Sequence, residues 1–144
     1  MDQIDQKILD VLTRDGRITV TDLAQHVGLS KTPCQARMRR LERQGFIRGY
    51  RAILDPQKMQ RAHIVFVEVK LARTSETALS AFNAAVSEVA EIEQCHMIAG
   101  GFDYLLKVRT GDITAYRHVL AEKIARLPHI AQTSTYVSMQ AVKD

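Results

Sequence analysis

The sequence predicts an α+β protein with a helical N-terminal unit and a C-terminal unit of order βαββαβ. Three observations lead to this prediction. Apolar residues recur at helical spacing between residues 4 and 41, strand-like runs alternate with two amphipathic helices between residues 63 and 142, and positive charge is concentrated near the N-terminus. The 144 residues, 46% of them hydrophobic, suffice for one ordinary domain or two very small ones.

The N-terminal apolar pattern predicts three helices. The first ends near Arg14, the second runs from Thr19 to Gly28, and the third begins after Ser30 or Thr32 and ends at Gly45. Thr19 is a favourable N-cap, and Gly28 is a favourable stop because glycine adopts left-handed backbone conformations freely. A helix, a short helix, a tight turn and a basic helix make up the helix-turn-helix pattern.

The basic residues cluster in and just after the third helix. Residues 1–61 hold 12 Lys/Arg and 7 Asp/Glu, a net charge of +5, whereas residues 62–144 hold 8 and 9, a net charge of −1; the sum is the overall +4. Within residues 31–51, seven basic residues stand against Glu42 alone. This concentration is typical of a surface that binds a polyanion.

On the third helix, Cys34, Met38 and Leu41 form the stripe expected to be buried, which leaves a polar and basic face. The Gln35 side chain can pair with adenine and that of Arg39 with guanine, while other cations suit phosphates. A solvated basic face on a helical bundle is the alternative. The DNA-contacting residues that we expect are Arg17, Lys31, Thr32, Gln35, Arg37, Arg39, Arg40 and Arg43.

Aromatic and β-branched residues over 46–54 predict a strand, and Asp55-Pro56 begins a turn and linker. We therefore expect a DNA-binding domain over 1–54, a linker over 55–62 and a second domain over 63–144. The second domain follows the ferredoxin-like βαββαβ order. Its expected elements are strand 63–72, helix 74–89, strand 92–98, strand 104–109, helix 113–127 and strand 133–142, with a tight turn at 100–103.

Several function classes lack their signatures in this sequence. There is no apolar run of about 18 residues, and the polar N-terminus does not look like a secretory signal, so a cytoplasmic location is expected. Two cysteines and five scattered histidines form no metal-ligand pattern. No catalytic nucleophile or nucleotide-binding motif is present, so we expect neither enzymatic activity nor a cofactor.

The order of motifs in both halves of the chain resembles the leucine-responsive regulatory protein family (Lrp/AsnC, the feast/famine regulators). The similarity spans essentially the whole chain. The motifs that carry it are Asp5-x-x-Ile8-Leu9, Asp15-Gly16-Arg17, Asp22-Leu23-Ala24, Val27-Gly28-Leu29-Ser30, Thr32-Pro33-Cys34, Arg39-Arg40-Leu41-Glu42, Gly45-Phe46-Ile47 and Gly101-Phe102-Asp103-Tyr104-Leu105-Leu106. Within the family, segments 31–37 and 94–100 resemble regulators of amino-acid catabolism, including proline use.

The resemblance implies a transcription regulator with an N-terminal winged helix-turn-helix and a C-terminal RAM (ACT-like) domain. That domain is expected to bind an amino-acid effector and to assemble the chain into dimers through the sheets and into octamers. Family members bind the effector near the loop matching residues 99–104, and the resemblance also implies effector contacts from the strand around residue 134. The effector-binding residues implied are Ala99, Gly100, Gly101, Asp103, Tyr104, Thr133 and Thr135.

The chemistry of this loop suits an amino acid. Gly100 and Gly101 allow backbone N–H groups to approach a carboxylate, and Asp103 can accept hydrogen bonds from an ammonium group. Alternatively, the glycines make only a hairpin turn and Asp103 only caps it. Two other functions remain open: a ligand-insensitive protein that organises the nucleoid, and a regulatory subunit of a small metabolic enzyme.

Overall fold

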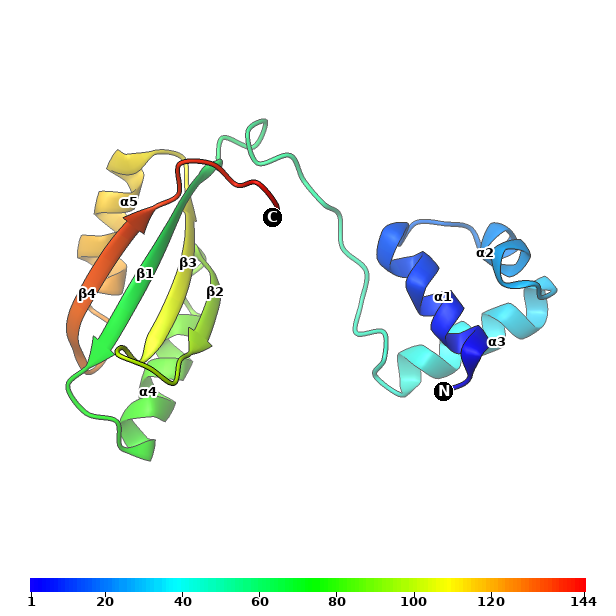
Figure 1. The fold of residues 1–144 in the computed structure, drawn as a ribbon, viewed down its shortest axis with the longest axis horizontal. Helices are drawn as coiled ribbons and strands as arrows, with labels where there is room; N and C mark the ends of the chain where they lie inside the picture. The colour runs from blue at the N-terminus through cyan, green and yellow to red at the C-terminus, as the bar shows by residue number, and fades with distance from the viewer. The chain divides into compact units, whose positions relative to one another are not determined.

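The computed structural model describes residues 1–144, which divide into two compact units, Met1–Ile53 and Leu54–Asp144 (Figure 1). Family-independent features of the sequence predicted a helical unit followed by a mixed one, and both are present. No helix in the chain has the length and apolar character needed to cross a membrane.

The N-terminal unit consists of α1 (Gln3–Arg14), α2 (Val20–Val27) and α3 (Lys31–Arg43). These elements confirm the predicted helix-turn-helix. Its small core contains Cys34 and Leu41 of α3, as the predicted stripe requires, while Met38 is partly buried at its margin. The remaining core residues come from the first two helices and are Ile8, Leu23, Ala24 and Val27.

Local hydrogen bonds fix where these helices begin and end. Thr19 accepts a 3.1 Å hydrogen bond from the Asp22 backbone N–H and donates a 2.6 Å bond to the Asp22 carboxylate, which confirms the predicted cap of α2. Gly28 ends α2 at φ 74°, in the left-handed region that glycine adopts at least cost. Ser30 precedes α3 but forms no side-chain cap hydrogen bond.

The strand predicted over residues 46–54 is wrong. The structure has no strand between Arg43 and His63, and Phe46, Tyr50 and Ile53 are exposed. The residue types favour extended backbone, but a strand also needs a neighbour for its N–H and C=O groups. The N-terminal unit contains no other strand to supply one.

The C-terminal unit has the order βαββαβ. Its elements are β1 (His63–Leu71), α4 (Glu76–Ser87), β2 (Ile92–Met97), β3 (Tyr104–Thr110), α5 (Ile113–Val119), the π-helical continuation η1 (Leu120–Ile124) and β4 (Ile130–Val137). All strand pairs are antiparallel in the spatial order β2-β3-β1-β4, with the helices covering one face (Figure 1). The ferredoxin-like prediction is confirmed.

The last strand lies earlier than predicted, over 130–137 rather than 133–142. Its ladder with β1 begins at Leu71↔Ile130 and reaches Val65↔Val137. The Ser138 N–H then donates a 2.9 Å hydrogen bond to the Ile64 carbonyl, close to where β1 itself starts at His63. Beyond that point β4 has no neighbour to pair with, so extended residue types alone do not prolong it.

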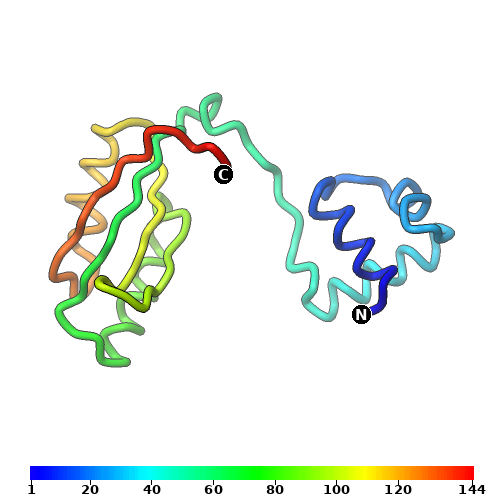
Figure 2. Tube along the Cα trace, in the orientation of Figure 1, coloured from blue at the N-terminus to red at the C-terminus, as the bar shows by residue number.

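The sheet has one face packed on the helices and one open face. Alternate β1 residues Val65, Val67 and Val69 are fully buried beneath α4 and α5, together with Phe82 of α4. The opposite β1 positions, Phe66, Glu68 and Lys70, belong to the open face. The connection between β2 and β3 runs across the end of β1, where the Asp103 N–H donates a 2.9 Å bond to the Val69 carbonyl (Figure 2).

Candidate nucleic-acid interface and ligand pocket

The outer side of α3 presents cations that no carboxylate neutralises. Lys31, Arg39 and Arg43 are exposed, and none of the ion pairs in the chain involves them. Gln35 is half-buried and Thr32 is exposed. Arg17, which follows α1, is also exposed and unpaired. The helix therefore offers both hydrogen-bonding groups and free positive charge, the combination that duplex DNA requires.

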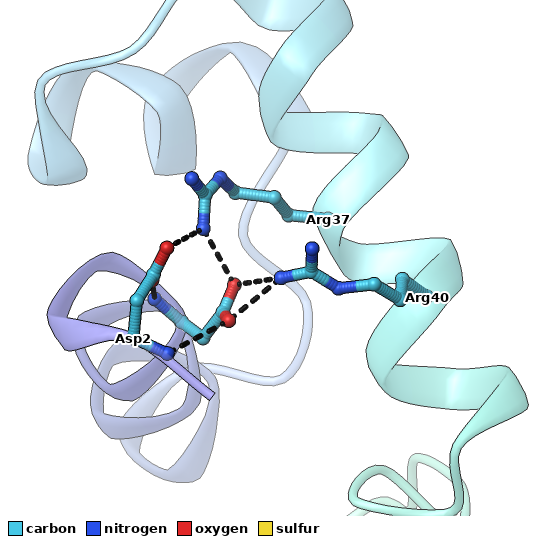
Figure 3. Close-up of polar contacts among 4 residues, drawn as sticks. Asp2, Arg37 and Arg40 are labelled. Carbon is cyan, nitrogen blue, oxygen red and sulfur yellow. Dashed lines mark hydrogen bonds and ion pairs between the residues drawn. The ribbon is translucent and has the colours of Figure 1, made fainter.

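Arg37 and Arg40 differ from these cations because they point at α1 (Figure 3). Arg37 Nη1 lies 2.6 Å from Asp2 Oδ2 and 2.9 Å from Asp5 Oδ1, and Arg40 Nη2 lies 2.8 and 2.7 Å from the two oxygens of Asp5. The Asp5 side chain is only 1% exposed. The four residues, here called the α1–α3 charge cluster, join the first helix to the third.

The cluster grows out of the N-cap of α1. The Asp2 carboxylate accepts from the Asp5 N–H at 2.8 Å, and the Asp5 carboxylate accepts from the Asp2 N–H at 3.1 Å, so the two residues form a reciprocal capping box. Because both carboxylates are held at the start of α1, they lie at fixed positions for the arginines of α3. Sequence reasoning missed this arrangement, although two acids three apart and two arginines three apart are its local signature.

Titration reflects the same contacts. The Asp5 backbone hydrogen bond, followed by the one from Arg37, lowers the pKa of Asp2 to about 2. Burial raises the pKa of Asp5, but the Asp2 backbone bond and the Arg37 hydrogen bond outweigh burial and leave it below its usual value. The Asp2 and Asp5 hydrogen bonds raise the pKa of Arg37. All three groups are therefore charged at neutral pH.

A second candidate site lies on the open face of the sheet. It is a small pocket of about 130 Å³, and it is bordered by the β2–β3 connection and by polar positions of β1 and β4. Its walls carry both signs of charge, Glu68 and Lys70, two residues apart on β1. This open-face pocket is lined by Glu68, Lys70, Gly101, Phe102, Gln132 and Ser134.

The seven predicted effector residues occupy four different environments. Gly101 lines the open-face pocket, and Ala99 and Gly100 are exposed beside it in the chain. Asp103 anchors the connection, because its carboxylate accepts a 2.7 Å hydrogen bond from the Leu71 N–H. Gly101 is thus the predicted residue that the structure brings directly to a pocket.

The other predicted residues point to the helix side of the sheet. Tyr104 is 2% exposed, and its hydroxyl donates a 2.7 Å hydrogen bond to Asn83 of α4. The hydroxyl of Thr135 lies 2.7 Å from that of Tyr116 on α5, and Thr133 faces Val69 across the β1–β4 ladder. Tyr104 is buried and Thr133 is half-buried, whereas Thr135 is exposed and held by its hydrogen bond to Tyr116. None of the three lines the open-face pocket.

Sequence reasoning missed the β1 and β4 residues of this pocket. Glu68 lies opposite Ser134 and Lys70 opposite Gln132 in the β1–β4 register. Two charged residues at alternate positions of an otherwise apolar strand were the available signal. Their neighbours on β4 can be identified only from the β1–β4 register, which cannot be read from the sequence.

Two family models match the chain. One is described as a winged helix-turn-helix DNA-binding family and matches residues 1–48. The other is described as the Lrp/AsnC ligand-binding domain and matches residues 64–144. The first covers α1 to α3 and the second covers the whole sheet with its helices, so each unit of the fold matches a model of its own.

Relatives and a solved structure match the chain over nearly its whole length. The chain is 58% identical over 144 residues to a proline dehydrogenase transcriptional activator of Rhizobium radiobacter, covering 100% of this chain and 92% of the relative. It is 50% identical to the leucine-responsive regulatory protein of Escherichia coli K12, covering 99% and 87%. A crystal structure of a Neisseria meningitidis transcriptional regulator in complex with L-Met superposes with a TM-score of 0.93 at 30% identity, covering 100% and 93%.

Proposed function

The chain belongs to the Lrp/AsnC family of DNA-binding transcription regulators, and we propose that a free amino acid bound to its C-terminal unit changes the affinity of α3 for specific duplex sites. The observation that carries the DNA half is the set of unpaired cations on the exposed side of α3. The observation that carries the amino-acid half is the pocket of opposite charges beside the glycine-containing connection.

In the DNA half, Gln35 and Arg39 read base edges, while Arg17, Lys31, Thr32 and Arg43 contact the backbone. Their exposure and lack of ion pairs support these roles. Arg37 and Arg40 act mainly by holding α3 against α1, since Asp2 and Asp5 already neutralise them. We expect phosphate contacts by these two arginines to contribute less to DNA affinity than those of the unpaired cations.

In the effector half, the ammonium group of the amino acid binds Glu68 and its carboxylate binds Lys70 and the backbone N–H groups of Gly100 and Gly101. The opposite charges and the exposed glycines support this orientation. Ala99 is an exposed residue of the same connection, and Asp103, Tyr104, Thr133 and Thr135 hold the frame of the site through their hydrogen bonds and strand pairing.

The names of the relatives suggest three effectors to compare. One relative is an activator of proline dehydrogenase, one is named for leucine, and one was crystallised with L-Met. The higher identity to the proline dehydrogenase activator favours control of amino-acid catabolism, with proline as the first effector to test. The regulator acts in the cytoplasm as a dimer or larger homo-oligomer and needs no cofactor.

Selection from a random duplex pool, repeated with each of the twenty amino acids, tests this function. We expect one recovered sequence motif and one or a few amino acids that change affinity for it. Equal binding of all duplexes, without any effector response, would favour the nucleoid-organising alternative. Lack of DNA binding in every condition would contradict the proposal and favour the alternative of a regulatory subunit of a metabolic enzyme.

A further inference from the structure

A short basic segment follows α3 and has no role in the function described so far. Residues 48–51, here called the basic arm, belong to no helix or strand and lie within the compact N-terminal unit, which extends to Ile53. Arg48 and Arg51 are exposed, and neither takes part in an ion pair. The arm therefore carries two free cations beyond the eight residues that we expected to contact DNA.

Tyr50 attaches the arm to the rest of the N-terminal unit. Its hydroxyl donates a 3.0 Å hydrogen bond to Oε1 of Glu42 on α3. A Cβ added to Gly16 would lie 3.7 Å from Cδ1 of Tyr50, so the tyrosine ring lies against the backbone of the turn between α1 and α2. Burial and the Glu42 hydrogen bond raise the pKa of Tyr50 to about 12, so the hydroxyl keeps its proton and remains a donor.

These two contacts place the arm beside the DNA-facing side of α3. Glu42 follows Gln35 by seven residues, close to two helical turns, so the two side chains lie on the same face of the helix. Gly16 directly precedes Arg17, another exposed and unpaired cation. The arm therefore extends the basic surface beyond the C-terminal end of α3.

The shape of duplex DNA indicates what this extension meets. When α3 occupies the major groove, a segment beyond the end of the helix reaches the phosphate backbone and then the neighbouring minor groove. That groove is about 6 Å wide, too narrow for a helix about 10 Å across, but it admits single side chains. Runs of A·T pairs narrow it further and strengthen its negative potential, which attracts arginine.

We propose that the basic arm is a second DNA-contacting element, in which Arg48 and Arg51 enter the minor groove next to the major groove read by α3 and Tyr50 positions them. The preferred partner is a duplex with a narrow, A·T-rich minor groove flanking the sequence that α3 recognises. This inference rests on the proposed function and deepens it, because it adds sequence preference at base pairs that α3 does not reach.

The flanking preference can be measured with duplexes that share the motif recovered by selection and differ only in the adjacent base pairs. By fluorescence anisotropy, we expect A·T flanks to be bound at least about 5-fold more tightly than G·C flanks. Inosine·cytosine flanks separate the two grooves, because inosine lacks the guanine N2 amino group in the minor groove but keeps the major-groove acceptors of guanine. They should bind like A·T flanks. Binding like G·C flanks would overturn the inference.

Variants of the arm test the residues themselves. The double substitution Arg48→Ala and Arg51→Ala should abolish the preference for A·T flanks while leaving the preference for the motif over random duplex unchanged. Arg73→Ala, which removes an exposed and unpaired arginine from the C-terminal unit, is the matched control and should change neither preference. If the double variant keeps the flanking preference of the wild-type protein, the inference is overturned and the proposed function stands.

Tyr50→Phe tests the positioning role without removing a cation. It deletes the hydrogen bond to Glu42, so it should weaken the preference for A·T flanks while leaving the slope of log affinity against log salt unchanged. An unchanged flanking preference in this variant would overturn the role of Tyr50. A wild-type protein that shows no motif preference on any duplex would overturn the proposed function, and this inference with it.

Discussion

The two pairs of arginines on α3 have the same charge but different surroundings. Arg37 and Arg40 are bound to the carboxylates of α1, whereas Arg39 and Arg43 are exposed and unpaired. The difference teaches that a count of basic residues overstates the positive charge that a helix offers to DNA. One pair stabilises the fold that presents the other pair, so substitutions should separate stability from DNA affinity.

The largest expected effect is on stability. Asp5→Ala removes the carboxylate that both arginines share and should lower the free energy of unfolding of the N-terminal unit by about 3 kcal/mol. It leaves Arg40 without a partner and Arg37 with Asp2 alone, and it removes half of the capping box of α1. Hydrogen exchange of the α1 and α3 amides measures the loss. Asp10→Ala, an exposed acid on the same helix, is the matched control. Equal exchange in the two variants would remove the structural distinction between the arginine pairs.

The next effect is on sequence recognition. Gln35→Ala should reduce the preference for the selected DNA motif over random duplex by about 2 kcal/mol, the value typical of one bidentate base contact. Competition binding by fluorescence anisotropy measures this ratio. The free energy of unfolding should stay unchanged, since the Gln35 side chain makes no hydrogen bond within the chain and alanine is compatible with helix α3. A uniform loss of affinity across all sequences would instead assign Gln35 to the DNA backbone.

Acid should loosen the α1–α3 charge cluster. Asp2 and Asp5 have lowered pKa values in the fold, so their contribution to stability is complete above the unfolded value near 3.8 and is lost as pH falls toward the folded value of about 2 for Asp2. We expect the α1 and α3 amides to lose protection between about pH 4 and pH 2. Asp5→Ala should flatten this dependence. A wild-type pH dependence in Asp5→Ala would place the responsible carboxylates elsewhere.

Local sequence patterns predicted much of this fold. The features that could not be predicted depend on contacts between residues that are distant in the sequence. The cap at Thr19, the stop at Gly28 and the buried stripe of α3 depend on neighbours within one or two turns, so the sequence states them directly. The strand expected over 46–54 and the far end of β4 depend on having a paired strand, which residue types do not specify.

The functional residues could likewise be predicted only where local sequence patterns place them. The exposed cations of α3 could be found from helical spacing, whereas the pairing of Arg37 and Arg40 with α1 required contacts over more than 30 residues. Gly101 was found because its loop resembles a family motif, but Gln132 and Ser134 reach the open-face pocket only through strand register.

The smallest predicted effect distinguishes the two arginine pairs on DNA itself. Arg43→Ala removes a free cation and should reduce the slope of log affinity against log salt by about 1, with a similar loss on every duplex. Arg37→Ala should change that slope less, because Asp2 and Asp5 already neutralise the guanidinium. The substitution also leaves the two carboxylates less neutralised, and their repulsion of DNA lowers affinity without reducing the number of counterions released by as much as Arg43→Ala does. Binding measured between low and moderate salt separates the two variants. If Arg37→Ala changes the slope as much as Arg43→Ala and leaves the α1 and α3 amides as protected from exchange as in the wild-type protein, Arg37 contacts phosphate. Both pairs of arginines would then bind the DNA backbone.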